Sequence, residues 1–120
     1  MGISSEKYWV IQLDEEATRR GDQRSFHVFA EGEHSDARGQ IYNLEEGSEL
    51  SLPHDRWPHH LFIVLGIHGT VDAHVGSDVL PLRAQSQMVI LPGTACKLTA
   101  RASAAIELIS LLSMPPRATV

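Results

Sequence analysis

Short apolar stretches, separated by glycine, proline and polar turns, recur along most of the chain. The clearest lies at residues 70–75, where Val71, Ala73 and Val75 alternate with polar residues at the two-residue period of a half-buried strand. Enrichment in β-branched and aromatic residues, bounded by turn residues, predicts the other strands. We expect these at 8–13, 25–30, 40–44, 49–52, 61–65, 79–82, 88–91 and 97–100.

Two segments fit more than one structure. Residues 104–112 (AAIELISLL) fit a helix or a strand, and we assign a strand because the rest of the chain is strand at short, regular spacing. Residues 14–21 (DEEATRRG) fit one helical turn or a polar loop. Nine or ten short strands without a long helix predict an all-β sandwich or barrel.

Three of the seven histidines lie just before the apolar run at residues 61–65. Imidazoles at the mouth of a buried strand can converge on a metal ion or a polar ligand. Neighbours in a strand point to opposite faces, so one of His59 and His60 should face inward, and the pattern leaves open which. We expect His27 to point outward, because it alternates with Phe26 and Val28. His68 and His74 share the polar face of the strand at 70–75 and should be solvated.

Composition narrows the possible classes of function. With 120 residues, 42% hydrophobic and 21% charged, the chain is globular and long enough for one domain. Ten basic residues against fifteen acidic ones give a net charge of −5, and their scatter along the sequence argues against a nucleic-acid partner. The single cysteine, Cys96, allows no intrachain disulfide. No segment has the pattern of a membrane span or a secretory signal, so we expect a cytoplasmic protein with no membrane partner.

The order of these pieces from about residue 40 to 112 resembles the cupin superfamily. The resemblance is carried by residues 44–47 (LEEG), the histidine cluster, the strand ending at Gly66, and residues 89–94 (VILPGT). It implies an all-β fold, the double-stranded β-helix or cupin jelly roll, as a single domain over residues 1–120. It also implies a homodimer, in which strands within residues 8–30 pack on the barrel or are exchanged between subunits.

Cupins carry two short motifs, G-x5-H-x-H-x3,4-E-x6-G and G-x5-P-x-G-x2-H-x3-N. In metal-binding members the three histidines and the glutamate hold one divalent metal. With Gly66 closing the first motif, His54 falls on the second histidine and His59 on the glutamate. A rival alignment puts His54 at the first histidine and His60 at the glutamate.

The second motif and the flanking residues complete the expected site. With Gly93 matched, Cys96 falls on the histidine position, while other ligand positions of both motifs hold non-ligating residues. Imidazole with thiolate suits a transition metal such as Zn, Fe, Cu or Ni. We expect Arg56 and Trp57, beside the histidines, at the ligand pocket, where Trp57 would stack on a ligand or plug the rim.

Two functions follow from the resemblance. The first is a small-molecule-binding cupin that acts as a metal-dependent enzyme of oxygenase, isomerase or lyase type, with metal ligands among His54, His59, His60 and Cys96. The second is a non-catalytic sensor or binding cupin that has lost its metal. A purely structural subunit with an apolar cavity is a third reading. The fold alone does not choose among them.

Overall fold

A computed structural model describes residues 3–4, 9–10, 12–27 and 37–113 of the chain. One helix, α1 (Leu13–Arg19), precedes most of the strands. The strands of the described residues are β1 (Ile3–Ser4), β2 (Trp9–Val10), β3 (Ser25–His27), β4 (Ala37–Leu44), β5 (Glu49–Ser51), β6 (His60–His68), β7 (Thr70–Val75), β8 (Asp78–Arg83), β9 (Gln87–Ile90), β10 (Lys97–Ala100) and β11 (Ala104–Leu112).

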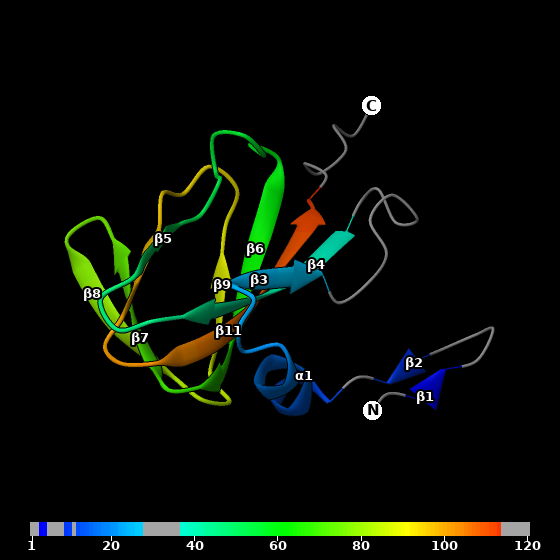
Figure 1. The fold of residues 1–120 in the computed structure, drawn as a ribbon. Helices are drawn as coiled ribbons and strands as arrows, with labels where there is room; N and C mark the ends of the chain where they lie inside the picture. The colour runs from blue at the N-terminus through cyan, green and yellow to red at the C-terminus, as the bar shows by residue number, and fades with distance from the viewer. Residues whose placement is uncertain (1–2, 5–8, 11, 28–36, 114–120) are drawn as a thin grey trace.

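Two antiparallel sheets face each other and form the barrel (Figure 1). One sheet has the order β5-β10-β7-β8 and the other has the order β3-β4-β11-β6-β9. The short β1–β2 ladder is separate from both sheets and lies beside α1 (Figure 1). The expected all-β fold is therefore confirmed, and residues 104–112 form a strand.

The core lies between the two sheets because apolar residues alternate along the strands. On β11 the even-numbered Ile106 and Leu108 point inward, and on β6 the even-numbered Phe62 and Val64 do the same. Phe62 is only 1% exposed. Burial of a side chain of this size contributes about 1.5–3 kcal/mol, so the inward faces of these strands supply much of the hydrophobic stabilisation.

A second, smaller cluster covers the outer face of the five-stranded sheet. Ala17 of α1 packs there with Phe26, Ile41 and Ala105. The helix is tied to the sheet through Asn43, whose Nδ2 lies 3.4, 3.1 and 3.1 Å from the carbonyl oxygens of Ala17, Arg20 and Gln23. Both faces of β4 and β11 are thus covered near their middles, the inner face by the barrel core and the outer face by α1.

Several strand boundaries differ from the sequence-based expectation, and two of the differences have a clear physical reason. The strand expected at 8–13 is described only at Trp9–Val10, and Leu13 begins the helix instead, where acidic residues in the first turn suit the helix dipole. β6 continues through Gly66, where a bend was expected, and the turn comes at Gly69 with φ +72°. A Cβ on Gly66 would lie 2.1 Å from the Arg83 carbonyl oxygen, so glycine here permits close strand packing. The expected residues 28–30 of the second strand and the tail from 114 onward lie outside the described residues.

Candidate functional site

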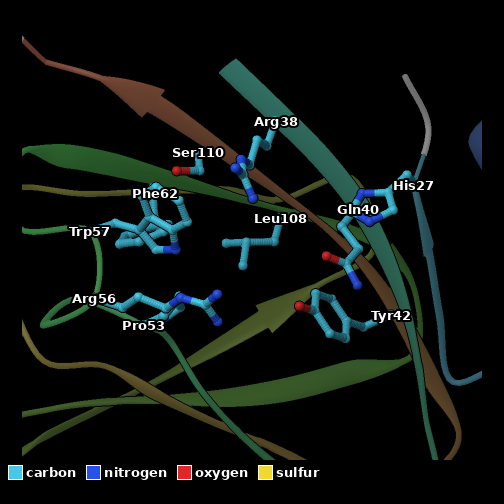
Figure 2. Close-up of a pocket in the computed structure, with 10 residues that line it drawn as sticks. All are labelled: His27, Arg38, Gln40, Tyr42, Pro53, Arg56, Trp57, Phe62, Leu108 and Ser110. Carbon is cyan, nitrogen blue, oxygen red and sulfur yellow. The ribbon is translucent and has the colours of Figure 1, made fainter. Parts of the chain in front are cut away.

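A pocket of about 270 Å³ opens at one end of the barrel, between β3, β4, β11 and the turn before β6 (Figure 2). Its lining combines aromatic and apolar groups with guanidinium, amide, phenol and hydroxyl groups. The lining residues are His27, Arg38, Gln40, Tyr42, Pro53, Arg56, Trp57, Phe62, Leu108 and Ser110.

Strand alternation explains why one wall of the pocket is polar. Arg38, Gln40 and Tyr42 occupy alternate positions of β4, so all three side chains point to the inner face. The ladder pairs Arg38 with Ser110 on β11 and Gln40 with Leu108. Side chains directly opposite each other in such a ladder have Cβ atoms about 4.5–5.5 Å apart. The polar row therefore lies beside the β11 residues that form the neighbouring wall.

The turn between β5 and β6 carries the aromatic wall. Two backbone hydrogen bonds shape this turn, from Trp57 N to Pro53 O at 3.0 Å and from His60 N to Trp57 O at 3.1 Å. The guanidinium carbon of Arg38 lies 4.4 Å from the centroid of the Trp57 ring, and that of Arg56 lies 5.7 Å from it. Both distances are within the range of cation–π attraction. The guanidinium groups of Arg38 and Arg56 therefore both lie near the Trp57 ring at the pocket.

The inward-facing histidine is His60. It is 7% exposed, and its Nδ1 lies 2.7 Å from the Oγ of Ser110, which is itself 8% exposed. Its ring centroid lies 5.1 Å from that of Trp57, with the planes tilted by 55°. His59 is exposed, as expected for its neighbour in the sequence. His60 therefore supports Ser110 and Trp57 at the pocket.

The charge of the lining is one-sided. Two arginines line the pocket, whereas neither Asp nor Glu is found among its lining residues in the described part of the chain. Burial raises the pKa of the Tyr42 phenol, so this group stays protonated at neutral pH and can donate a hydrogen bond. The pocket thus offers cations near Trp57 and neutral polar groups near Tyr42.

The residues expected to share a metal lie in three separate places. His54 and Cys96 line a different hollow of about 200 Å³, together with His74. The Cys96 side chain is buried against the barrel core, and burial raises the pKa of its thiol, which disfavours the thiolate that binds metals. The Nδ1 of His54 lies 3.4 Å from the Leu52 carbonyl oxygen.

No three or more His, Cys, Asp or Glu side chains within the described ranges are placed to hold one metal ion. As arranged, the expected donors do not fit a single metal centre. The ligand set of His54, His59, His60 and Cys96 therefore stays a prediction from sequence. Arg56 and Trp57 line the hollow of about 270 Å³, and their part in binding a ligand stays a prediction from sequence.

The sequence analysis named two of the ten lining residues, Arg56 and Trp57, and did not assign the other eight to the pocket. His27 is exposed, as expected, and it also contributes to the lining of the pocket. Arg38 lies before the strand expected at 40–44, but β4 begins at Ala37 and includes it. The alternation of Arg38, Gln40 and Tyr42 in ARGQIYNL was the available signal for this wall.

The two remaining histidines differ from each other. His68 is exposed, as expected. His74, also expected to be solvated, is partly buried, with its Nε2 3.2 Å from the Thr99 hydroxyl oxygen. Lys97 and Thr99 of the neighbouring strand β10 share this face of the sheet, and their side chains cover part of the His74 ring. No helix within the described residues is long and apolar enough to cross a membrane.

Comparison with known proteins relates this geometry to a fold. Neither a family model nor a curated protein matches the sequence. Solved structures do match. A cupin-2 domain containing protein from Shewanella frigidimarina has a TM-score of 0.68 at 17% identity, over 85% of this chain and 94% of that one. A cupin superfamily protein from Desulfitobacterium hafniense has a TM-score of 0.64 at 8% identity, over 74% and 76% of the two chains.

A third structure, KdgF from Halomonas sp., has a TM-score of 0.63 at 12% identity and covers 75% of this chain and 80% of that one. Identities this low carry the fold and no activity. The resemblance seen in the sequence is confirmed at that level, and the chain has the cupin fold.

Proposed function

We propose that this protein binds a small organic anion in the pocket at the mouth of its cupin barrel. The observation that carries the proposal is the pair of arginines, Arg38 and Arg56, which line the pocket within cation–π distance of the Trp57 ring. Hydrogen bonds from guanidinium to an anionic oxygen are about twice as strong as neutral ones. An anion is therefore the ligand whose charge this lining complements.

The surroundings of the arginines favour binding of an organic rather than a simple inorganic ion. Trp57, Phe62 and Leu108 present apolar surface beside the guanidinium groups. Small-molecule sites have this composition, a mostly apolar wall with a few polar groups that fix orientation. The volume of about 270 Å³ suits a metabolite smaller than a typical drug.

Between the two functions expected from sequence, the pocket favours the binding or sensing protein over the metal-dependent enzyme. Apart from the imidazole of His27, the groups that line the pocket are guanidinium, indole, amide, hydroxyl and hydrocarbon groups, and a single imidazole does not make a metal site. Metal analysis of the purified protein distinguishes the two. Stoichiometric Zn, Fe, Cu or Ni that disappears in His54→Ala would favour the enzyme instead.

Binding of matched carboxylate and amide ligands tests the proposal. We expect hexanoate to shift the indole N–H resonance of Trp57 in a titration followed by nuclear magnetic resonance, and hexanamide to bind more weakly. Loss of one charge-assisted hydrogen bond, about 1.5–3 kcal/mol, corresponds to a roughly 10- to 150-fold weaker affinity for hexanoate in Arg38→Gln.

Arg83→Gln is the matched control, because Arg83 is exposed on β8 and does not line this pocket. This control should bind hexanoate as the wild type does. Equal affinity for hexanoate and hexanamide in the wild type, or unchanged hexanoate affinity in both Arg38→Gln and Arg56→Gln, would contradict the proposal.

A further inference from the structure

We infer that the outer face of the five-stranded sheet is a docking surface for a segment of another protein, in which aliphatic side chains surround one lysine or arginine that pairs with Glu107. This surface lies on the opposite side of the sheet from the anion pocket, because Glu107 is the neighbour on β11 of Leu108, which lines that pocket. The inference is therefore independent of the proposed function.

Aliphatic side chains fill alternate positions on this face. The even-numbered residues of β6 and β11 face the core, so their odd-numbered residues face outward. The ladders place Ile63 between Ile109 on β11 and Val89 on β9. On the same two central strands, Leu61 lies beside Leu111. Together with Leu65, these residues form one patch, which we call the outer apolar face: Leu61, Ile63, Leu65, Val89, Ile109 and Leu111.

Within the described residues, α1 covers one end of this side of the sheet. Its residue Ala17 packs there with Ile41 and Ala105 (Figure 1). The six residues of the outer apolar face belong to neither of the two hydrophobic clusters formed by the described residues. They are partly or largely accessible, and Val89 is 49% exposed. Contiguous apolar surface of this kind is typical of protein–protein contact sites.

Glu107 borders the outer apolar face and has no partner in the described part of the chain. It lies between Ile41 and Leu65 in the ladders and is 6% exposed. It forms no hydrogen bond or ion pair with a described residue. Every fully buried side-chain nitrogen or oxygen atom of the described residues has a hydrogen-bond partner, so the carboxyl oxygens of Glu107 keep some contact with solvent. A group from outside can therefore reach them.

Charge decides which partner fits this surface. Burial raises the pKa of the Glu107 carboxyl, because its charged form loses water. A partner that covers the outer apolar face removes the remaining water, and a buried carboxylate without a partner is strongly destabilising. Neither lysine nor arginine occupies an outward position of β4, β11, β6 or β9, so the same face of a second copy supplies no cation. A different chain, with lysine or arginine among aliphatic residues, complements both the carboxylate and the apolar surface.

Selection from a random peptide library on the immobilised full chain tests this inference. The selection is made at about pH 8, well above the usual pKa of a carboxyl group. Two matched variants identify the peptides that bind the outer apolar face: Val89→Lys, on this face, and Val79→Lys, on β8 of the other sheet. These valines are 49% and 55% exposed, so both variants should fold. Peptides that bind the outer apolar face should lose binding to Val89→Lys and keep it with Val79→Lys.

We expect these peptides to carry lysine or arginine flanked by leucine, isoleucine or valine. Measured by fluorescence anisotropy, their binding to Glu107→Gln should be roughly 10- to 150-fold weaker, the loss of one charge-assisted hydrogen bond. Glu46→Gln, at an exposed position, is the matched control and should bind them as the wild type does.

A change in the peptide provides a second test that uses the wild-type protein alone. Replacement of the cationic residue of the peptide by norleucine should weaken its binding to the wild type by a similar factor. The same replacement should have little further effect on binding to Glu107→Gln, because the two changes remove the same interaction.

Three results would overturn the inference. The first is that no library peptide distinguishes Val89→Lys from Val79→Lys. The second is that the peptides that do so lack a cationic residue or bind equally well to Glu107→Gln. The third is a wild-type dimer in sedimentation velocity that Val89→Lys dissociates and Val79→Lys does not, because a second copy then occupies the face.

Discussion

Substitution of Ser110 by alanine tests whether the pocket depends on its buried polar pair. The change removes the Oγ that lies 2.7 Å from His60 Nδ1, at a position where the two residues are only 8% and 7% exposed. Removal of one partner of a buried hydrogen bond costs about 1–3 kcal/mol. Since Ser110 lines the pocket, water can replace part of the lost contact, and we expect a cost of about 1–2 kcal/mol.

Thermal unfolding followed by circular dichroism measures this cost. An unfolding entropy of about 2.1 cal/mol/K per residue gives about 250 cal/mol/K for 120 residues, so the expected decrease in Tm is about 4–8 °C. Ser77→Ala, at an exposed position in the turn between β7 and β8, is the matched control and should change Tm by less than about 2 °C.

A double-mutant cycle with His60→Phe makes the reasoning refutable. If the hydrogen bond stabilises the fold, the double variant should be more stable than the sum of the two single effects predicts, by about 0.5–3 kcal/mol. A Tm for Ser110→Ala equal to that of Ser77→Ala, together with additive effects in the cycle, would show that the pair contributes nothing to stability.

Two further predictions concern the frame that supports the pocket. Gly66→Ala should lower the free energy of unfolding, measured in urea, by about 1–3 kcal/mol, because the added Cβ would meet the Arg83 backbone. Gly21→Ala is the control and should have little effect, because the nearest contact of its Cβ would be at 3.4 Å. Equal urea midpoints for the two variants would contradict this prediction. Burial raises the pKa of Glu107 above 4.5, so ionisation opposes folding, and the stability of the wild type should fall as the pH rises from about 4.5 through the raised pKa. The Tm difference between Glu107→Gln and the wild type should then grow in favour of the variant from about pH 4 to pH 8, while exposed Glu45→Gln shows no such trend.

Period-two alternation predicted the strand at 70–75, and enrichment in β-branched and aromatic residues between turn residues predicted most of the others. The strands at 70–75, 97–100 and 104–112 have the bounds predicted from the sequence. Prediction was less successful where glycine allows two outcomes. At Gly66 the residue serves close strand packing and the strand continues, whereas Gly69 takes the positive φ of a turn, and composition does not distinguish these uses.

The candidate site was only partly predictable, for a physical reason. A sheet covered on both faces has apolar residues on both, so parity alone does not tell which face holds the pocket. Phe26 packs under α1, and its neighbour His27 is exposed, as expected, but also lines the pocket, which the parity did not predict. Family motifs directed attention to His54 and Cys96, which line a different hollow, while Arg56 and Trp57 were identified from their place beside the histidines.

The clamp that Asn43 makes on the carbonyl oxygens at the end of α1 has a consequence for the opposite face of the same strand. A shift of β4 by one residue would turn its side chains over and present Gly39, Ile41 and Asn43 to the cavity. These hydrogen bonds keep the Asn43 side chain on the outer face of β4. They therefore keep Arg38, Gln40 and Tyr42 on the inner face, where they line the pocket. A single-residue deletion within β4 would move the side chains on one side of the deletion to the opposite face of the sheet, although the composition of the strand would hardly change.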